Sequence, residues 1–273
     1  MSLKGRVAAI TGGASGMGRA IALALAEDGA DVVVGSLTKD KGSARPGEIV
    51  TVLSDEDLGQ VRDEIMKKGG RALALSLDVT KADVARRFIE TTAKEFGRVD
   101  ILVNAAGIAC EQMIVDHDDA LWQRLIDVNL TGTYYCTKAA LPHMIRNKWG
   151  RIINISSTAA NIGGARNGAY CASKAGVLGL TRALAVEVAE HNITVNAICP
   201  AWVSTDFGKR WVGAIAKNEG VDEKAKYVEI AKNYPHQRLM TPEEIANLAL
   251  FLSQERSAGI SGQDLTVSRG QLW

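Results

Sequence analysis

Tyr170 and Lys174 stand four residues apart, and a pair of serines, Ser156 and Ser157, lies just upstream. Four residues make about one turn of an α-helix, so the phenol and the ammonium group would share one helix face. A cation beside a tyrosine favours the phenolate and lowers the tyrosine pKa from its ordinary value of ~10. Such a pair could move a proton near neutral pH, as the interconversion of an alcohol and a ketone requires. The spacing alone is common by chance, and a solvated lysine beside a half-buried tyrosine would produce it too.

The start of the chain indicates a site for a phosphate group. Residues 7–10 form a short apolar run, typical of a strand buried on both faces, and residues 19–27 are rich in alanine and leucine, typical of a helix. Between them, residues 11–18 carry four glycines, which let a phosphate approach the backbone. The N–H groups and the positive dipole end of the following helix would bind that anion. A glycine-rich turn without a ligand is the alternative, but the order strand, loop, helix is the context that such a site requires.

Several motifs follow one another in the order found in short-chain dehydrogenases/reductases, and the chain resembles this family from about residue 3 to residue 267. The shared motifs are Thr-Gly-x-x-x-Gly-x-Gly at residues 11–18, Asp78-Val79, Asn104-Ala105-Ala106-Gly107, the asparagine Asn129, the serine Ser157, Tyr-x-x-x-Lys at residues 170–174, and Pro200-Ala201-Trp202-Val203-Ser204-Thr205. Ala105 stands where the family often has a second asparagine, and Ala201 where it often has a glycine. Independent motifs in the right order make this resemblance specific.

The resemblance implies a catalytic tetrad of Asn129, Ser157, Tyr170 and Lys174. In this family the tyrosine gives a proton to the substrate oxygen or takes one from it. The lysine lowers the tyrosine pKa and holds the nicotinamide ribose, and the serine donates a hydrogen bond to the carbonyl. The asparagine holds a water that connects the lysine to solvent. The cofactor performs the hydride chemistry, and no metal is expected.

The resemblance also implies a nicotinamide dinucleotide cofactor whose contacts are spread over the whole chain. The residues expected to bind it are Gly12, Ser15, Gly16, Met17, Gly18, Ser36, Asp78, Val79, Asn104, Ala105, Ala106, Gly107, Tyr170, Lys174, Pro200, Ala201, Val203 and Thr205. An acidic residue at the tip of the second strand usually binds the ribose of NAD, whereas a nearby arginine suits the 2′-phosphate of NADP. Here Ser36 takes the acidic position, and basic residues that could meet a phosphate come shortly after it: Lys39, Lys41 and Arg45. NADP(H) is therefore favoured, with NAD(H) as the alternative.

The alternation of short apolar runs with longer helical stretches predicts a single domain over residues 1–273. Strands are expected near residues 7–11, 31–36, 71–77, 100–104, 151–155, 193–198 and 264–267, and helices near 17–28, 55–68, 81–96, 118–147, 169–190 and 242–253. This alternation predicts an α/β fold, a Rossmann-type doubly wound parallel sheet of about seven strands with helices on both faces. Ligands of such sheets bind at the carboxyl ends of the strands, which is where the motifs fall.

Two segments depart from the alternation. Residues 37–54 connect a strand to a helix with more residues than the family usually has. We expect an insertion on the rim of the adenosine half of the cofactor site, with a solvated surface loop as the alternative. Residues 201–237 predict a lid over an apolar part of the substrate, because a long connection beside an active site is rich in aromatic residues. Those residues are Trp202, the strongest candidate for the pocket wall, and Phe207, Trp211, Tyr227 and Tyr234, some of which would be core or subunit contacts.

Composition argues against several function classes. The 273 residues are 47% hydrophobic and 23% charged with a net charge of +1, so no basic surface argues for nucleic acid. No apolar run is long enough to cross a bilayer, and no signal peptide is expected. The cysteines are widely spaced, which predicts reduced thiols in a cytoplasmic protein: Cys110, Cys136, Cys171 and Cys199. The histidines are isolated and indicate no metal site: His117, His143, His191 and His236.

Two arginines are candidates to meet an anionic substrate group, because arginine suits carboxylates and phosphates. Arg269 replaces a glycine frequent near the C-terminus of the family, and Arg166 lies in one of the loops expected to shape the substrate pocket, which are residues 110–117, 158–168 and 201–237. A surface or interface salt bridge is the alternative for each arginine.

The leading function is an NAD(P)(H)-dependent oxidoreductase that interconverts a secondary alcohol and a ketone. A 3-oxoacyl substrate, a small polyol, a sugar and a cyclic alcohol all fit this expectation. A dinucleotide-binding sensor without catalysis is the alternative, but such proteins usually lack the tyrosine or the lysine, and the full tetrad is present here. An epimerase or dehydratase is disfavoured by the glycine spacing. The family resemblance also implies a homotetramer, formed through the helices expected at residues 118–147 and 169–190.

Overall fold

The computed structural model describes residues 2–38 and 44–271. Its centre is a seven-stranded parallel sheet in the order β3-β2-β1-β4-β5-β6-β7. The strands are β1 (Val7–Thr11), β2 (Asp31–Ser36), β3 (Ala72–Ser76), β4 (Ile101–Asn104), β5 (Gly150–Ile155), β6 (Ile193–Pro200) and β7 (Asp264–Val267). The strand order reverses between β1 and β4, so the sheet is doubly wound, as the sequence predicts, and a crevice is expected at that point.

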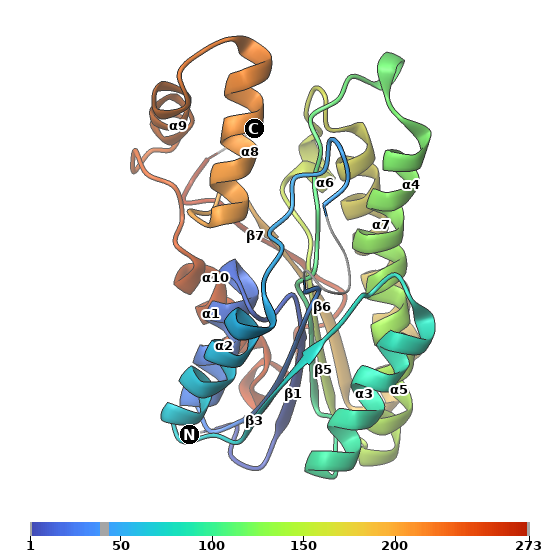
Figure 1. Ribbon diagram of the computed structural model, residues 1–273. Helices are drawn as coiled ribbons and strands as arrows, with labels where there is room; N and C mark the ends of the chain where they lie inside the picture. Colours follow the sequence, from blue (N-terminus) through green and yellow to red (C-terminus); the bar gives the residue numbers. More distant parts are fainter. Residues whose placement is uncertain (1, 39–43, 272–273) are drawn as a thin grey trace.

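Helices cover both faces of the sheet (Figure 1). On one side lie α1 (Gly16–Glu27), α2 (Asp55–Lys67) and α10 (Pro242–Leu252), and on the other α3 (Ala82–Phe96), α4 (Asp119–Ile126), α5 (Gly132–Asn147) and α7 (Gly168–Glu187). Shorter helices are α6 (Ala159–Ile162) and three 3₁₀ turns, Ile114–Asp116, Ala189–His191 and Glu255–Ser257.

Strand residues alternate between two apolar layers, because successive side chains of a strand point to opposite faces. Ala8 and Ile10 of β1 belong to one buried cluster together with Ile21 of α1. Ala9, which stands between them, belongs to the other cluster together with Phe88 of α3. Strands buried on both faces therefore read as continuous apolar runs, which is the pattern that identified them in the sequence.

The structure differs from the sequence prediction at two places. The helix expected over residues 118–147 is divided by a π-helical turn, Asp127–Thr131, between α4 and α5. Residues 201–237, expected as a long aromatic-rich connection, contain the helices α8 (Asp206–Glu219) and α9 (Glu223–Lys232). Thr205 caps α8 by accepting a hydrogen bond from the N–H of Gly208, and Asp222 caps α9 in the same way through Ala225.

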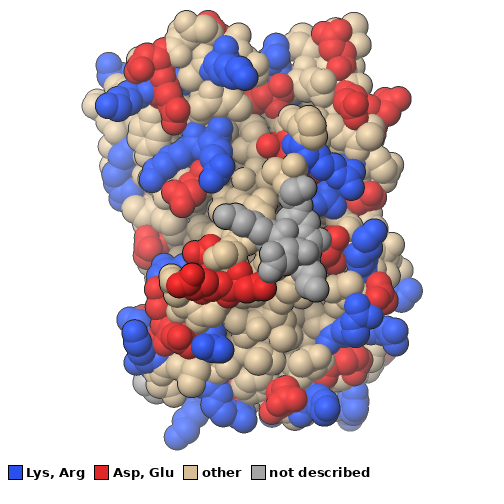
Figure 2. Space-filling view, in the orientation of Figure 1, with Lys and Arg blue, Asp and Glu red and all other residues tan. Residues whose placement is uncertain are grey.

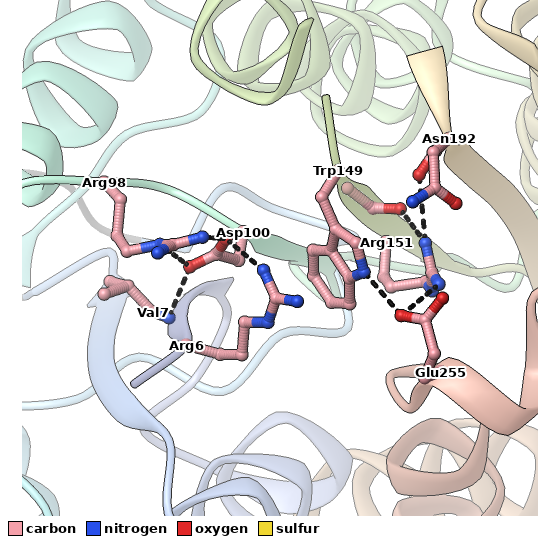
Figure 3. A network of polar contacts seen from close by, with 9 residues as sticks. Arg6, Val7, Arg98, Asp100, Trp149, Arg151, Asn192 and Glu255 are labelled. Carbon is pink, nitrogen blue, oxygen red and sulfur yellow. Dashed lines mark hydrogen bonds and ion pairs between the residues drawn. The ribbon is translucent and has the colours of Figure 1, made fainter. Parts of the chain in front are cut away.

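The amino-terminal end of the sheet is held by a buried carboxylate and the arginines around it (Figure 3). The carboxylate of Asp100, just before β4, is fully buried and accepts hydrogen bonds from the guanidinium groups of Arg98, at 2.6 Å, and Arg6, at 3.2 Å. It also accepts one from the backbone N–H of Val7, at 2.9 Å, which ties β4 to β1. Functional groups are expected at the opposite, carboxyl end of the strands, so this network serves the fold.

Candidate active site

The glycine loop between β1 and α1 is packed too closely for any side chain at two positions. A Cβ on Gly12, whose φ is +64°, would lie 2.8 Å from the backbone nitrogen of Ala106, and a Cβ on Gly18 would lie 2.2 Å from the carbonyl oxygen of Gly12. The hydroxyl of Thr11 accepts hydrogen bonds from the N–H groups of Ala105 and Ala106, both at 3.2 Å. The loop is thereby fixed against the end of β4.

The first turn of α1 offers N–H groups that no side chain caps. Ser15, at the N-cap position, makes no capping hydrogen bond, and the first turn carries no acidic residue. The hydroxyl of Ser36 accepts a hydrogen bond from the N–H of Ala14, at 3.1 Å, which holds the loop against β2. Uncapped N–H groups at the positive end of a helix bind anions, so the loop fits the pyrophosphate of a dinucleotide.

A cavity at the carboxyl ends of the strands, the cofactor cavity, brings together most of the residues expected to bind the cofactor. It is lined by Gly12, Ser15, Gly16, Met17, Gly18, Ser36, Asp78, Val79, Ala105, Ala106, Gly107, Tyr170, Lys174 and Thr205. Three further residues of that set, Pro200, Ala201 and Val203, line an adjoining cavity that shares Tyr170 and Thr205 with the first. The two cavities meet at the tyrosine.

Asn104 is an exception, because its side chain is buried within the fold and lines neither cavity. Its amide nitrogen donates hydrogen bonds to the hydroxyl of Thr137, at 3.1 Å, and to the amide oxygen of Asn154, at 2.8 Å. Asn154 in turn donates to the hydroxyl of Thr181, at 2.9 Å. Asn104 therefore joins β4 to β5 and to the helices α5 and α7. Its place in the motif is explained by this structural network.

Asp78 lines the cofactor cavity with one carboxylate oxygen already engaged. Its Oδ1 accepts hydrogen bonds from the N–H of Thr80, at 3.0 Å, and from the Thr80 hydroxyl, at 2.7 Å. This local turn fixes the orientation of the carboxylate. A fixed acceptor at the rim of the cavity suits an amino group such as that of adenine.

Residues 44–53, the crossing segment, run past the carboxyl ends of the strands (Figure 1) and contribute part of the lining of the cofactor cavity. The segment ends near β2, where its last residue, Leu53, forms a bridge with Thr38, and in its middle Ile49 forms an antiparallel bridge with Ala109 beyond β4. Its inner residues line the cavity: Ala44, Glu48, Val50, Thr51, Val52 and Leu53. Arg45 belongs to this segment, whereas Lys39 and Lys41 lie outside the described residues. The segment is thus built against the site along most of its length.

Tyr170 is buried at the junction of the two cavities. Burial raises the pKa of its phenol to about 12, although a hydrogen bond from Ser157 favours the phenolate. The hydroxyl oxygen of Ser157 accepts the N–H of Ala159 at 3.1 Å, which leaves its proton free to be donated. The hydroxyl groups of Tyr170 and Ser157 therefore lie next to each other, where both could reach the same substrate oxygen.

Lys174 faces the tyrosine but does not lower its pKa in this structure. Its Nζ lies 5.7 Å from the centre of the Tyr170 ring and donates a hydrogen bond to the carbonyl of Ile155 at 2.8 Å. Burial lowers the pKa of Lys174 itself to about 8. The sequence predicts a depressed pKa for this tyrosine, whereas burial raises it in the structure.

Asn129 lies in the π-helical turn between α4 and α5 and is fully buried. Its Nδ2 donates to the carbonyl of Ile108, at 3.0 Å, and to the hydroxyl of Ser173, at 2.9 Å, while its Oδ1 accepts the N–H of Ile108, at 2.9 Å. A Cβ on Gly107 would lie 3.4 Å from both Asn129 Oδ1 and Lys174 Nζ, so these two groups approach the same space. A π-turn of this kind often marks a functional site.

The adjoining cavity, the substrate cavity, has aromatic walls. Trp211 of α8 packs edge-on against the Tyr170 ring, with ring centres 4.8 Å apart, and against Trp202 and Phe207, at 5.3 and 5.8 Å. All three line the cavity together with Tyr170 and Ser157. Trp202 was the predicted wall residue, and Trp211 and Phe207 join it.

The other two aromatic residues of this region support the fold instead. The hydroxyl of Tyr234 accepts the N–H of Trp202 at 2.7 Å, and that of Tyr227 bonds to the Ser204 hydroxyl at 3.1 Å. Neither lines a cavity at this site.

Nothing in the sequence pointed to Glu111, yet its side chain contacts Trp211, a residue of the wall of the substrate cavity. Its Oε1 accepts a hydrogen bond from Nε1 of Trp211, at 2.5 Å, and its side chain also bonds to Asn167. Burial raises the pKa of Glu111, and these bonds and the charge of Arg166 oppose that shift. An acidic residue in a variable loop carries no periodic or motif signal, so only its place beside Trp211 identifies it.

The two candidate arginines do not line the substrate cavity. Arg269 forms an ion pair with Glu244 of α10, and the positive charge of Arg166 lowers the pKa of Glu111. For Arg269 the structure bears out the salt-bridge alternative.

Charges of both signs are interspersed on the face shown in Figure 2. Within the described ranges, no three His, Cys, Asp or Glu side chains lie close enough together to hold a metal ion. No helix of the described chain is long and apolar enough to span a membrane.

Comparison with known proteins identifies the family. The sequence model described as short chain dehydrogenase matches residues 6–214. The chain belongs to the short-chain dehydrogenase family. It is 36% identical over 266 residues to the D-beta-hydroxybutyrate dehydrogenase of Rhizobium meliloti, which covers 97% of this chain and 98% of the relative. It is 35% identical over 272 residues to a 3-oxoacyl-(acyl-carrier-protein) reductase of Synechocystis sp., covering 99% and 98%.

A solved structure supports the same assignment. The crystal structure of NAD+-bound xylitol dehydrogenase superposes with a TM-score of 0.88 at 28% identity and covers 99% of this chain and 100% of that one. The short-chain dehydrogenase described here is thus an oxidoreductase with a nicotinamide dinucleotide site. Its relatives act on hydroxyl and oxo groups, as their names state.

Proposed function

We propose that this short-chain dehydrogenase interconverts a secondary alcohol and a ketone, with Tyr170 as the acid and base. One observation carries the proposal: the hydroxyl groups of Tyr170 and Ser157 meet where the cofactor cavity joins the substrate cavity. A substrate oxygen placed there is within reach of both. The relatives that reduce oxo groups or oxidise hydroxyl groups support the same reaction class.

Each residue of the tetrad has a part that its contacts support. The Ser157 hydroxyl, whose oxygen accepts the N–H of Ala159, turns its proton from Tyr170 to the substrate oxygen and orients that oxygen, and one such donor contributes about 3 kcal/mol of barrier lowering. The Tyr170 phenol, with a pKa of about 12, is protonated at neutral pH and gives its proton to the oxygen during reduction. Lys174, which lines the cofactor cavity, would hold the nicotinamide ribose, and Asn129 fixes the loop after β4 beside it. The bound cofactor supplies or accepts the hydride.

NADP(H) is the proposed cofactor, with NAD(H) as the second candidate. The proposal depends on Ser36, which stands where an acidic residue would repel a 2′-phosphate and whose hydroxyl is bonded to the glycine loop. Arg45 adds a positive charge next to Ala44, a residue of the cavity wall. The related xylitol dehydrogenase structure is bound to NAD+, which favours the second candidate. The ratio of kcat/KM for the two cofactors decides between them, and a higher value with NAD(H) overturns the first.

The test of function is a spectrophotometric screen at ~340 nm, where reduced nicotinamides absorb, with secondary alcohols, polyols, sugars and 3-oxoacyl thioesters. We expect turnover in at least one class, abolished by Tyr170→Phe. Cofactor binding without turnover of any alcohol or ketone would favour a dinucleotide-binding sensor instead. We further propose that the enzyme is cytoplasmic and acts as a homotetramer without nucleic acid or membrane partners. Its exposed apolar residues on α5 and α7 include Tyr134, Ile145 and Val186.

A further inference from the structure

The substrate cavity has an unusual property for a site whose relatives include an enzyme named for a hydroxy acid: none of its described lining residues is charged. Its polar residues carry hydroxyl and amide groups, and the rest are glycines or apolar and aromatic residues.

The basic residues considered for this site, Lys174, Arg166 and Arg269, do not line the substrate cavity. Lys174 lines the cofactor cavity, and its Nζ donates to the carbonyl of Ile155. Arg269 is paired with Glu244. Arg166 acts on Glu111, and its charge opposes the rise in the pKa of that carboxyl group. A carboxylate in the substrate cavity would therefore lose its hydration without gaining a cation.

The group that supports the aromatic wall is itself an acid. Glu111 is hydrogen-bonded to the indole N–H of Trp211, whose ring forms part of the wall and packs against Tyr170. A substrate carboxylate lying along this wall would meet the field of a second carboxylate. Burying an unpaired anion is strongly unfavourable, and a like charge nearby adds to the cost.

The same wall suits a flat or branched apolar group. The ring of Trp211 lies edge-to-face against the rings of Tyr170, Trp202 and Phe207. Aromatic faces and edges of this kind bind rings and alkyl chains through apolar contact. We propose that the substrate cavity selects an uncharged ketone or secondary alcohol whose reacting carbon carries an apolar group, and that it excludes short oxo acids and hydroxy acids. This inference rests on the proposed function and names its substrate class.

A matched pair of substrates tests the exclusion of charge. We would compare 3-oxobutanoate with its methyl ester, which differ by one charge, at saturating NADPH and again at saturating NADH. The inference expects kcat/KM for the ester to exceed that for the acid by about 100-fold or more, as an unpaired buried carboxylate implies. An acid used as well as the ester would overturn it. A phenyl-substituted ketone such as 4-phenyl-2-butanone should be used at least as well as the ester.

A gain of charge provides the converse test. Phe207→Arg places a cation on the wall and should shift the acid-to-ester ratio of kcat/KM toward the acid by about tenfold or more, on the order of one buried ion pair. The control, Phe207→Met, removes the ring without adding charge and should leave that ratio unchanged. A ratio that moves equally in both variants would show that bulk, and not charge, sets the preference.

Ligand binding separates failure of this inference from failure of the proposed function. Trp202 and Trp211 lie in the wall, so their fluorescence reports occupancy even if no ketone is turned over. Titration with the methyl ester should quench this fluorescence at concentrations where 3-oxobutanoate has no effect. Selective binding of the ester, with no turnover of any compound in the wider screen of alcohols, sugars and ketones, would reject the proposed function and keep the charge selection. Equal binding of the acid would reject the selection, whatever the turnover.

Discussion

Glu48 and Arg124 form an ion pair at the wall of the cofactor cavity, with Nε of the arginine 3.0 Å from Oε1 of the glutamate. The two residues come from the crossing segment and from α4, and their side chains are only 2% and 11% exposed. A buried pair of this kind is costly to break, whereas an exposed pair contributes little. It joins the crossing segment to the far side of the cavity, where Ile49 and Ala109 add two backbone hydrogen bonds, at 2.8 and 3.0 Å.

The first prediction concerns cofactor release. Glu48→Gln removes the charge that holds the crossing segment to Arg124, so the segment should open more often and the cofactor should dissociate about tenfold faster, equivalent to ~1.4 kcal/mol. Stopped-flow displacement of bound NADPH, followed by its fluorescence, measures the rate constant. Asp83→Asn, which breaks the exposed pair with Arg87, is the matched control and should change nothing. An unchanged dissociation rate in Glu48→Gln would mean that the segment does not retain the cofactor.

The crossing segment shows how far sequence reasoning reaches. Its position was predicted on the rim of the adenosine half, because extra residues after β2 must lie near that end of the sheet. Its contacts could not be predicted, since Glu48 and Arg124 are 76 residues apart and neither belongs to a motif. From sequence alone, charged residues in a loop are predicted to be solvated, because the sequence does not show which oppositely charged residues the fold brings next to them.

The second prediction concerns the tyrosine. Tyr170→Phe removes the proton donor at the junction of the cavities and should reduce kcat by about 1,000-fold, in the range of general acid–base catalysis. Cofactor affinity, measured by fluorescence titration, should change less than about threefold, because the ring and its packing against Trp211 remain. Tyr227→Phe, which removes a hydroxyl bonded to Ser204 outside both cavities, is the control and should retain full activity. A tenth of wild-type turnover in Tyr170→Phe would show that another group carries the proton.

The third prediction concerns pH. Burial raises the pKa of Tyr170 to about 12, so at pH 6–9 the phenol is protonated. Ketone reduction uses the phenol and should vary little across this range. Alcohol oxidation needs the phenolate, whose fraction rises tenfold for each pH unit below the pKa, so log kcat/KM for oxidation should climb with a slope near ~1. Rates in both directions, measured in buffers of equal ionic strength, check this. Oxidation that is level from pH 7 to pH 9 would indicate that cofactor binding restores a depressed pKa.

The tetrad shows which properties of the site its motifs predict and which they do not. The sequence predicts a tetrad of Asn129, Ser157, Tyr170 and Lys174, and the structure brings the serine and tyrosine into contact. It missed the π-turn around Asn129, because hydrophobic periodicity continues through a single wide turn. It also missed the direction of the tyrosine pKa shift, since that depends on how much water the folded chain excludes and not on residue spacing.

The fourth prediction concerns assembly. Val186 on α7 is 82% exposed in the single chain, and Tyr134 on α5 is also exposed. Apolar side chains on these helices fit a homotetramer, which should sediment as four times the 29.1 kDa of one chain. Val186→Glu should shift the distribution toward smaller species if α7 forms the interface, whereas Val228→Glu on α9 should not. A monomer in the wild-type sample at micromolar concentration contradicts the proposal.

The last prediction follows from the separation between the two ends of the sheet. Asp100 lies at the amino ends of the strands, whereas the tetrad lies toward their carboxyl ends. Asp100→Asn weakens its bonds to Arg6 and Arg98 and should cost about 2–3 kcal/mol, which for a chain of this size lowers the Tm by roughly 5–10 °C. The kcat at 25 °C should stay within about twofold of the wild-type value, because ligands of doubly wound sheets bind at the opposite end of the strands. Asp63→Asn, which breaks the exposed pair with Arg62, is the control for the loss of a surface charge and should leave the Tm unchanged. A large fall in kcat without a fall in Tm would show that the buried charges act on the active site through the sheet, and the two ends would then have to be treated as coupled.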